Sequence, residues 1–195
     1  MKITIIGLGL IGGSIAKTLS RFKDNQIFAF DTNQSSISNA IENKSIQGSI
    51  ESLNDLKKTE YEDSLVILAT PPSITVDILK SLDFLFNSSV TITDTTSAKS
   101  SLNKILQKFN FPENIIFSHP VAGSHLSGAV NSIDDLFKGK SAILSYHDSA
   151  APLHVNRVMS LWQELGSKFQ FWMLSCMMRS LHILVIFPML LLTHY

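Results

Sequence analysis

The feature that most constrains the fold of this chain is a glycine-rich segment near its start, Gly7-Leu8-Gly9-Leu10-Ile11-Gly12. A short apolar run at residues 3–6 precedes it, and apolar residues recur at helical spacing from 11 to 19. Gly7 permits a tight turn, Gly9 lets a ligand approach the backbone, and Gly12 allows the helix to pack closely on the strand. The segment therefore predicts a buried strand, a tight turn and a helix in direct succession.

Asp31 lies at the position where strand–turn–helix units of this kind have an acidic residue that binds a ribose. Residues 27–30 form a second apolar run, and Asp31 follows it, about 20 residues after the glycines. The amino end of the helix attracts phosphates, and the Asp31 carboxylate can accept hydrogen bonds from an adenosine ribose. This carboxylate repels a 2′-phosphate and no arginine follows it, so segment 7–12 with Asp31 predicts NAD rather than NADP. The alternative is a glycine turn without a ligand, with Asp31 as an ordinary turn residue.

Strand and helix patterns alternate along the rest of the chain. Further buried strands are expected at residues 64–69, 90–93, 115–117, 142–144 and 169–171. Helical spacing occupies residues 74–82 and 97–109, and a last helix has Pro152 in its first turn and Gly166 at its end. The alternation predicts an α/β protein: a doubly wound, mostly parallel sheet of the Rossmann type with helices on both faces.

Composition narrows the environment and the partners. The 195 residues are 45% hydrophobic and 16% charged, with a formal net charge of zero, so a packed core is expected and nucleic acid is not. The single cysteine, Cys176, fits a reducing compartment, and neither a signal peptide nor about 18 consecutive apolar residues is visible. We expect a cytoplasmic protein that binds no membrane and no metal ion.

Three loops follow expected strands and carry polar or turn-forming residues, at 69–72, 94–99 and 118–124. In an open parallel sheet, ligands bind beyond the carboxyl ends of the strands, so these loops should converge on one crevice. We expect the cofactor to be contacted there by Ala69, Thr70, Pro71 and Asp94.

His119 is the candidate acid–base group in that crevice. Its ordinary pKa lies near neutrality, so it can take a proton from an alcohol as hydride leaves. Ser97 can hold a hydroxyl or the imidazole. The structural alternatives are a histidine that only shapes the loop before Pro120, and Asp94 and Ser97 as caps of the following helix, Ser97 above all. His147 and His154 lack such a context and are expected at the surface.

With these loops the chain resembles the prephenate and arogenate dehydrogenases, which make the precursor of tyrosine. The shared segments, over residues 1 to about 171, are the glycine loop, Ala69-Thr70-Pro71-Pro72, Asp94-Thr95-Thr96-Ser97-Ala98-Lys99, His119-Pro120-Val121-Ala122-Gly123-Ser124 with Ser127-Gly128, and Asp135-Leu136-Phe137-Lys138-Gly139-Lys140. The His119 segment is the most specific of these, because many dehydrogenases share the glycine loop.

The resemblance implies an oxidative decarboxylation of prephenate or arogenate, in a family of homodimers. His119 would draw the proton from the ring hydroxyl while hydride passes to NAD, and Ser97 would hold that hydroxyl and His119. Ser124 would lie at the substrate mouth. His125 stands where the family often has an acidic residue, which affects access or substrate preference. Two other hypotheses stay open: another NAD-dependent hydroxyacid dehydrogenase, and a cofactor-binding remnant without catalysis.

The tail, residues 172–195, departs from the family, whose sheet domain is followed by a helical domain that completes the substrate pocket and forms the dimer. The tail is mostly apolar and lacks that domain's motifs. The family's missing motifs reappear if the coding DNA of the tail is read in the frame that starts one base earlier. In that frame the codons of Trp172-Met173 give leucine-aspartate, and those of Met177-Met178 permit histidine-aspartate. The codons of residues 185–189 permit Ser-His-Leu-Pro-His. We therefore expect a dinucleotide-binding domain at 1–171 and an out-of-frame tail that leaves both the activity of this chain and the family's dimer doubtful. The alternative is a genuine apolar helix that packs on the sheet or on a partner.

Overall fold

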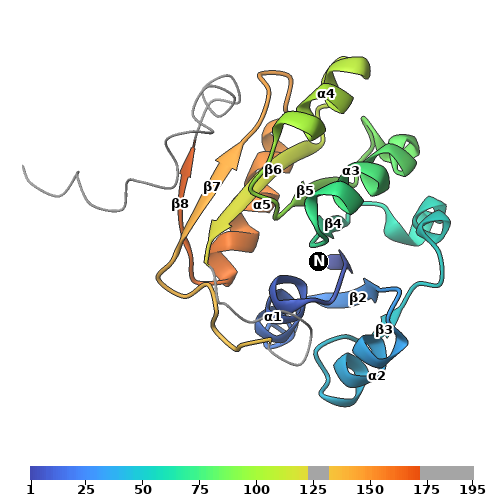
Figure 1. Ribbon diagram of the computed structural model, residues 1–195, viewed down its shortest axis with the longest axis vertical. Coiled ribbons are helices and arrows are strands. Elements are labelled where there is room, and N and C mark those ends of the chain that lie inside the picture. The colour runs from blue at the N-terminus through green and yellow to red at the C-terminus, as the bar shows by residue number, and fades with distance from the viewer. Residues whose placement is uncertain (123–131, 172–195) are drawn as a thin grey trace, which may run out of the picture.

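The computed structural model describes residues 1–122 and 132–171 of the chain (Figure 1). The expectations for Ser124, His125 and the tail therefore concern residues outside the described part. The strands are β1 (Lys2–Ile6), β2 (Gln26–Phe30), β3 (Gly48–Ser49), β4 (Leu65–Leu68), β5 (Thr91–Asp94), β6 (Ile115–Val121), β7 (Ser141–Ser145) and β8 (Lys168–Phe171). The α-helices are α1 (Leu10–Leu19), α2 (Gln34–Glu42), α3 (Pro72–Ser81), α4 (Ser100–Lys108) and α5 (Pro152–Glu164), with short 3-10 helices η1 (Leu53–Lys57), η2 (Thr59–Tyr61) and η3 (Asp83–Leu85).

The strands form one sheet in the order β3-β2-β1-β4-β5-β6-β7-β8. Every neighbouring pair is parallel except β6 and β7, which are antiparallel. The chain winds outward from β1 in one direction to β3 and in the other from β4, so the order reverses between β1 and β4. Ligands bind at such a switch point, beyond the carboxyl ends of the strands. The prediction of a doubly wound, mostly parallel sheet is confirmed.

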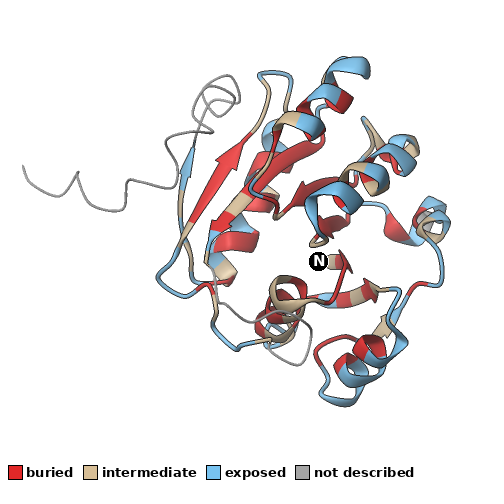
Figure 2. Ribbon diagram, in the orientation of Figure 1, coloured by how far each residue is buried: buried red, intermediate tan, exposed pale blue. Residues whose placement is uncertain are grey.

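The two faces of the sheet are covered by different helices, and the alternation of side chains along each strand explains why. In β1, Ile3 and Ile5 point to the face packed by α1, α2 and α5, while Ile6 points to the face packed by α3 and α4. β4 alternates in the same way, and all four of its residues are buried. Figure 2 shows buried residues along the central strands and exposed residues on the outer sides of the helices.

The ends of two helices test the sequence predictions. Pro152 is the first residue of α5, and Gly166 follows the helix with a φ of +74°, both as expected. The helix expected from residue 97 begins instead at Ser100, and its N-cap is Lys99, whose side chain makes no capping hydrogen bond. The alternative that Ser97 caps this helix is therefore wrong, because the backbone between β5 and α4 turns for three further residues before the helix begins.

One histidine lies in the interior, against expectation. His154 of α5 is 3% exposed, and its Nδ1 shares a hydrogen bond of 2.7 Å with Oγ1 of Thr91 at the start of β5. The expectation that His154 lies at the surface is wrong, since the helix face that carries it packs on the sheet. Within residues 1–122 and 132–171, no helix is long and apolar enough to cross a bilayer.

Candidate active site

The turn after β1 has room only for glycine at two of its positions. Gly7 has a φ of +95°, and a Cβ there would lie 2.7 Å from the carbonyl oxygen of Ala69. A Cβ on Gly12 would lie 1.9 Å from the carbonyl oxygen of Gly7. The first turn of α1 thus packs directly on the glycine turn, as the sequence predicts for Gly12.

Gly9 differs, because it faces open space. It is the N-cap of α1, it makes no side-chain capping bond, and a Cβ added to it would have no protein atom within 4 Å. The amides of the first helical turn have no partner within the helix and carry a partial positive charge. A helix start with this charge and an open backbone approach fits a dinucleotide pyrophosphate. Segment 7–12 therefore fits the cofactor that the sequence predicts.

Asp31 lies at the carboxyl end of β2, next to the glycine turn. Its Oδ2 accepts a hydrogen bond of 2.6 Å from the amide of Leu8, and its Oδ1 accepts one of 2.8 Å from the amide of Asn33. A carboxylate has about four lone-pair sites, so each oxygen keeps capacity for a further donor such as a ribose hydroxyl. The structure thus joins Asp31 to the glycine turn and orients it through the backbone.

The loop after β4 borders the same turn. Ala69 donates its amide to the Ile6 carbonyl at 2.8 Å, so β4 ends level with β1. A Cβ on Gly7 would lie 2.8 Å from Cγ2 of Thr70. Pro71 is the exposed N-cap of α3. The structure brings segment 69–71 together with the glycine turn at the switch point of the sheet.

Asp94, at the end of β5, is the centre of a buried polar cluster. Its Oδ2 accepts hydrogen bonds from the Thr96 amide at 3.0 Å, the Thr96 hydroxyl at 2.5 Å and Nζ of Lys99 at 2.5 Å. Asp94 is 1% exposed and Lys99 is 3% exposed. The other oxygen, Oδ1, is buried and has no hydrogen-bond partner in the part of the chain that the structure describes. The Asp94 side chain therefore holds its own loop and the neighbouring lysine.

His119 lies on β6, where this strand continues past the end of β5. Asp94, the last residue of β5, pairs with Phe117, and His119 pairs on its other side with Ile143 of β7. Burial lowers the pKa of His119, the nearby Lys99 charge lowers it further, and Asp94 partly opposes them. The imidazole is therefore neutral at neutral pH and able to accept a proton.

Ser97, the predicted partner of His119, has no hydrogen bond to it in this structure. Ser97 is exposed on the loop between β5 and α4, and within residues 1–122 and 132–171 its hydroxyl makes no hydrogen bond with the imidazole. Nδ1 of His119 is buried without a hydrogen-bond partner in the same residues. Both residues lie at the carboxyl edge of the sheet, but the role predicted for Ser97 needs a substrate hydroxyl between them.

Lys99 is the site residue that sequence reasoning missed. A lysine five positions after Asp94 in a glycine-poor loop reads as a solvated charge, since lysines are seldom fully buried. The available signal was the loop itself, which carries both an aspartate and a lysine directly after a buried strand. Among the described residues, no group of three or more histidine, cysteine, aspartate or glutamate side chains could hold a metal ion.

The segment after residues 123–131 docks on the cofactor helix. The amide of Ile133 donates to the Ser14 hydroxyl at 2.9 Å, and Nζ of Lys17 donates to the Ser132 carbonyl at 2.9 Å. Arg21, just past the end of α1, forms ion pairs with the two aspartates at positions 134 and 135. The chain that leaves His119 is thereby tied at its far end to the helix that carries the glycine loop.

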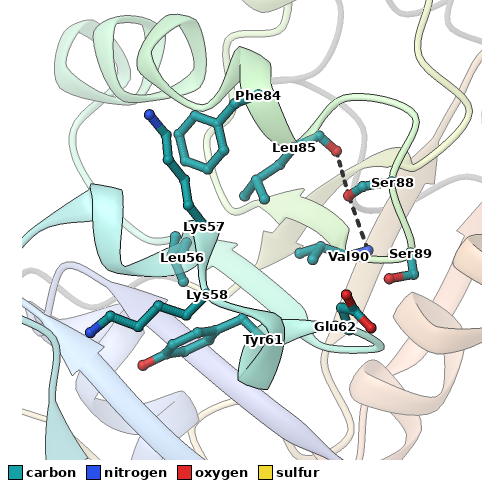
Figure 3. Close-up of a pocket in the computed structure, with 10 residues that line it drawn as sticks. All are labelled: Leu56, Lys57, Lys58, Tyr61, Glu62, Phe84, Leu85, Ser88, Ser89 and Val90. Atoms are coloured by element: carbon teal, nitrogen blue, oxygen red, sulfur yellow. Dashed lines mark hydrogen bonds between the residues drawn. The ribbon is translucent and has the colours of Figure 1, made fainter.

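A pocket of about 320 Å³ lies at the amino-terminal ends of the parallel strands, opposite the candidate site (Figure 3). Its walls come from η1 and η2, from η3, and from the residues just before β5, so it sits at the amino ends of the strands. The lining residues include Lys57, Lys58, Tyr61, Phe84 and Val90. No predicted site residue lines it, and we assign the candidate active site to the carboxyl edge.

Comparison with known proteins identifies the family of the chain. Residues 15–171 match the family described as prephenate dehydrogenase, nucleotide-binding domain. A prephenate dehydrogenase of Lactococcus lactis is 33% identical over 148 residues, which are 74% of this chain and 40% of that protein. A cyclohexadienyl dehydrogenase of Zymomonas mobilis is 28% identical over 168 residues, 85% of this chain and 56% of that protein.

The fold also matches a solved structure. The prephenate dehydrogenase of Aquifex aeolicus, in complex with hydroxyphenyl propionate and NAD+, is 26% identical with a TM-score of 0.79. The match covers 91% of this chain and 61% of that one. The chain thus spans about half the length of the curated relatives it matches. On its sequence match over residues 15–171, the chain belongs to the prephenate dehydrogenase family and contains that family's nucleotide-binding domain.

Proposed function

We propose that the chain binds NAD along segment 7–12 and Asp31, and takes part in the oxidative decarboxylation of prephenate or arogenate with His119 as the base. The observation that carries the proposal is the environment of His119. Burial and a neighbouring positive charge lower its pKa, at the carboxyl edge where the glycine turn opens. A base kept neutral at that edge is what removal of a proton from a substrate hydroxyl requires.

The mechanism follows from these positions. The amino end of α1 binds the phosphates, and Asp31 accepts hydrogen bonds from the adenosine ribose. Bound NAD supplies the acceptor for the hydride that leaves the carbon bearing the substrate hydroxyl. His119 accepts the proton of that hydroxyl as the carbonyl forms, and loss of carbon dioxide leaves the ring aromatic. By the family resemblance, Ser97 would hold the hydroxyl in place, and Ser124 and His125, which lie outside the described residues, would contact the substrate.

Exchange of Asp31 for serine tests the cofactor preference. Serine cannot replace two carboxylate oxygens as acceptors, so NADH binding is expected to weaken by about tenfold or more. The repulsion of a 2′-phosphate disappears in the same variant, so the ratio of NADPH to NADH affinity rises. Titration of both reduced cofactors by their fluorescence measures this. Asp31→Glu, which keeps the charge, should still discriminate against NADPH; equal discrimination in Asp31→Ser would assign the preference elsewhere.

Turnover tests the reaction itself. The chain is incubated with NAD and either prephenate or arogenate, and NADH formation is followed by absorbance. Product formation from one of the two substrates, at a rate lowered by the out-of-frame tail, is the expected result. NADH binding without turnover of either would instead identify a cofactor-binding unit without catalysis, and turnover of a simple 2-hydroxy acid would identify another hydroxyacid dehydrogenase.

We further propose that residues 1–171 are the dinucleotide-binding domain, that the protein is cytoplasmic, and that the family's dimer depends on the region replaced by residues 172–195. Sequencing the coding DNA tests the frame of this tail. If no single-base shift near codon 171 opens a frame with the family's missing motifs, the tail is genuine. If one does, the frame-restored protein should gain turnover in the same assay.

A further inference from the structure

Lys99 is an ammonium held inside the protein at the edge of the candidate site. Its side chain is 3% exposed, and it stands at the N-cap of α4, between the ends of β5 and β6. A lysine costs free energy to bury, because its charged form loses its hydration. A charged lysine buried beside the candidate site is therefore stable only if specific partners compensate for its lost hydration.

The partners of Lys99 are all acceptors. Its Nζ lies 2.5 Å from Oδ2 of Asp94, 2.7 Å from the carbonyl oxygen of Ser118 and 3.5 Å from the Thr96 hydroxyl. The ring of Phe117 lies 5.4 Å from the same nitrogen, within cation–π range. An ammonium has three donors and no acceptor, and this shell offers it three oxygens and an aromatic face. Burial lowers the pKa of Lys99, and the Asp94 carboxylate opposes this by its charge and its hydrogen bond. The acceptors around Nζ thus favour the charged form of the lysine.

The bond to Ser118 connects Lys99 to the candidate base. Ser118 directly precedes His119 on β6, and its own hydroxyl is held at 2.5 Å by Oγ1 of Thr93 on β5. One lysine therefore joins the β5 carboxylate to the backbone that carries His119. Movement of that backbone would require breaking a charge-assisted hydrogen bond in the interior.

Lys99 and Asp94 are also the charges that act on His119 among the described residues. On the other side of β6, strand β7 carries no titratable residue between Ser141 and Ser145. On α5, which packs on β6, the titratable side chains are engaged elsewhere: Arg157 with Asp63, Glu164 with Asn25, and His154 with Thr91. The balance between one buried cation and one buried anion is thus the local electrostatic environment of the imidazole.

We propose that Lys99 is a positioning residue for His119: its ammonium, clamped between Asp94 and the Ser118 carbonyl, fixes the backbone of the base and places a positive charge beside the imidazole. The inference rests on the proposed function insofar as His119 is the base. A positive charge disfavours the imidazolium and a negative one favours it. Loss of Lys99 should therefore raise the pKa of His119, and loss of the Asp94 charge should lower it.

The test is a charge cycle read out by NMR on the whole chain. The His119 imidazole signal, assigned with His119→Asn, is titrated in the wild type, Lys99→Gln, Asp94→Asn and the double variant. We expect a higher pKa in Lys99→Gln, a lower one in Asp94→Asn and an intermediate one in the double variant. The double variant removes both buried charges together, so it stays informative if a single variant leaves an unpaired charge and unfolds.

A purely structural lysine gives a different pattern. Loosening of the cluster would expose His119 in every variant, and all pKa values would move upward toward the ordinary value. That result, or no shift at all, would overturn the proposal. Lys99→Arg keeps the charge and should keep the wild-type titration.

Activity separates this inference from the proposed function. In turnover, Lys99→Gln should lower kcat by about ten- to a hundredfold, as misplaced catalytic groups do, with NADH affinity unchanged. Its acid limb in the pH profile should move to higher pH. If the His119 pKa values follow the expected order but neither the wild type nor any variant turns over substrate, the role of Lys99 is upheld and the proposed reaction is overturned. If the chain turns over substrate but the His119 pKa values do not follow that order, the proposed reaction is upheld and the role of Lys99 is overturned.

Discussion

Replacement of Gly12 by alanine is expected to abolish measurable NADH binding and to destabilise the fold. The new Cβ would lie 1.9 Å from the carbonyl oxygen of Gly7 and 3.1 Å from the Cβ of Ala69, so α1 must move away from the turn. Overpacking against backbone costs on the order of 3 kcal/mol, which corresponds to roughly 10 °C in melting temperature for a chain of this size. Thermal unfolding and NADH fluorescence titration measure the two effects.

Gly9→Ala is the matched control three residues away. A Cβ there meets no protein atom within 4 Å, and Gly9 has a negative φ that alanine adopts without strain. The melting temperature should therefore stay within a degree or two, on the order of a surface substitution. NADH affinity should nevertheless fall by about tenfold or more, because the methyl occupies the space through which the pyrophosphate approaches. Undiminished NADH binding by Gly9→Ala would show that the cofactor does not cross this turn.

Replacement of His119 by asparagine is expected to lower kcat by about 10²- to 10⁴-fold with whichever of prephenate and arogenate the chain oxidises. Asparagine keeps a polar group of similar reach but cannot take up a proton. NADH affinity should change little, since the glycine turn and Asp31, which are expected to bind the cofactor, follow β1 and β2, whereas His119 lies on β6. Initial rates, together with NADH titration of the same preparation, separate the two effects.

His154→Asn is the control for His119→Asn. Burial also lowers the pKa of His154, but this residue lies on the buried face of α5. It shares a hydrogen bond with Thr91 at the start of β5, and Asp94 lies at the other end of that strand. Its loss should reduce stability and leave the rate per folded molecule unchanged. If His154→Asn reduced kcat as strongly as His119→Asn, or if His119→Asn retained turnover, the base would have to be sought elsewhere.

The fold was largely predictable because its signals are local. The strand–turn–helix unit at the start and the alternation of short apolar runs with helical spacing predict parallel strands with helices on both faces. β7 could not be placed antiparallel from sequence, because a short apolar run has the same appearance in either direction. The start of α4 was also misjudged, since Ser97 is a good capping residue and only the path of the backbone excludes it.

The candidate site was predictable as a set of loops but not as a set of contacts. Asp94, Ser97 and His119 were singled out by residue type and by their expected positions after strands. The strand bounds were too short, because β5 includes Asp94 and β6 continues through His119 to Val121, where it pairs with β7. The exposure of Ser97, the interior position of His154 and the attachment of residues 132–135 to α1 were not foreseen. Each depends on how segments far apart in the chain pack together, and no local pattern records that packing.

The sequence by itself determined the glycine turn, because a φ of +95° at Gly7 and a 1.9 Å approach at Gly12 admit no side chain. It also determined the acidic residue that closes the nucleotide unit. The tertiary structure alone decided the state of Lys99, a lysine that would be solvated in an isolated loop. Folding brings β5 and β6 together and surrounds its ammonium with the Asp94 carboxylate and the Ser118 carbonyl. The electrostatic environment of His119 is therefore a property of the assembled sheet, because β6, which carries His119, meets Asp94 and Lys99 only after folding.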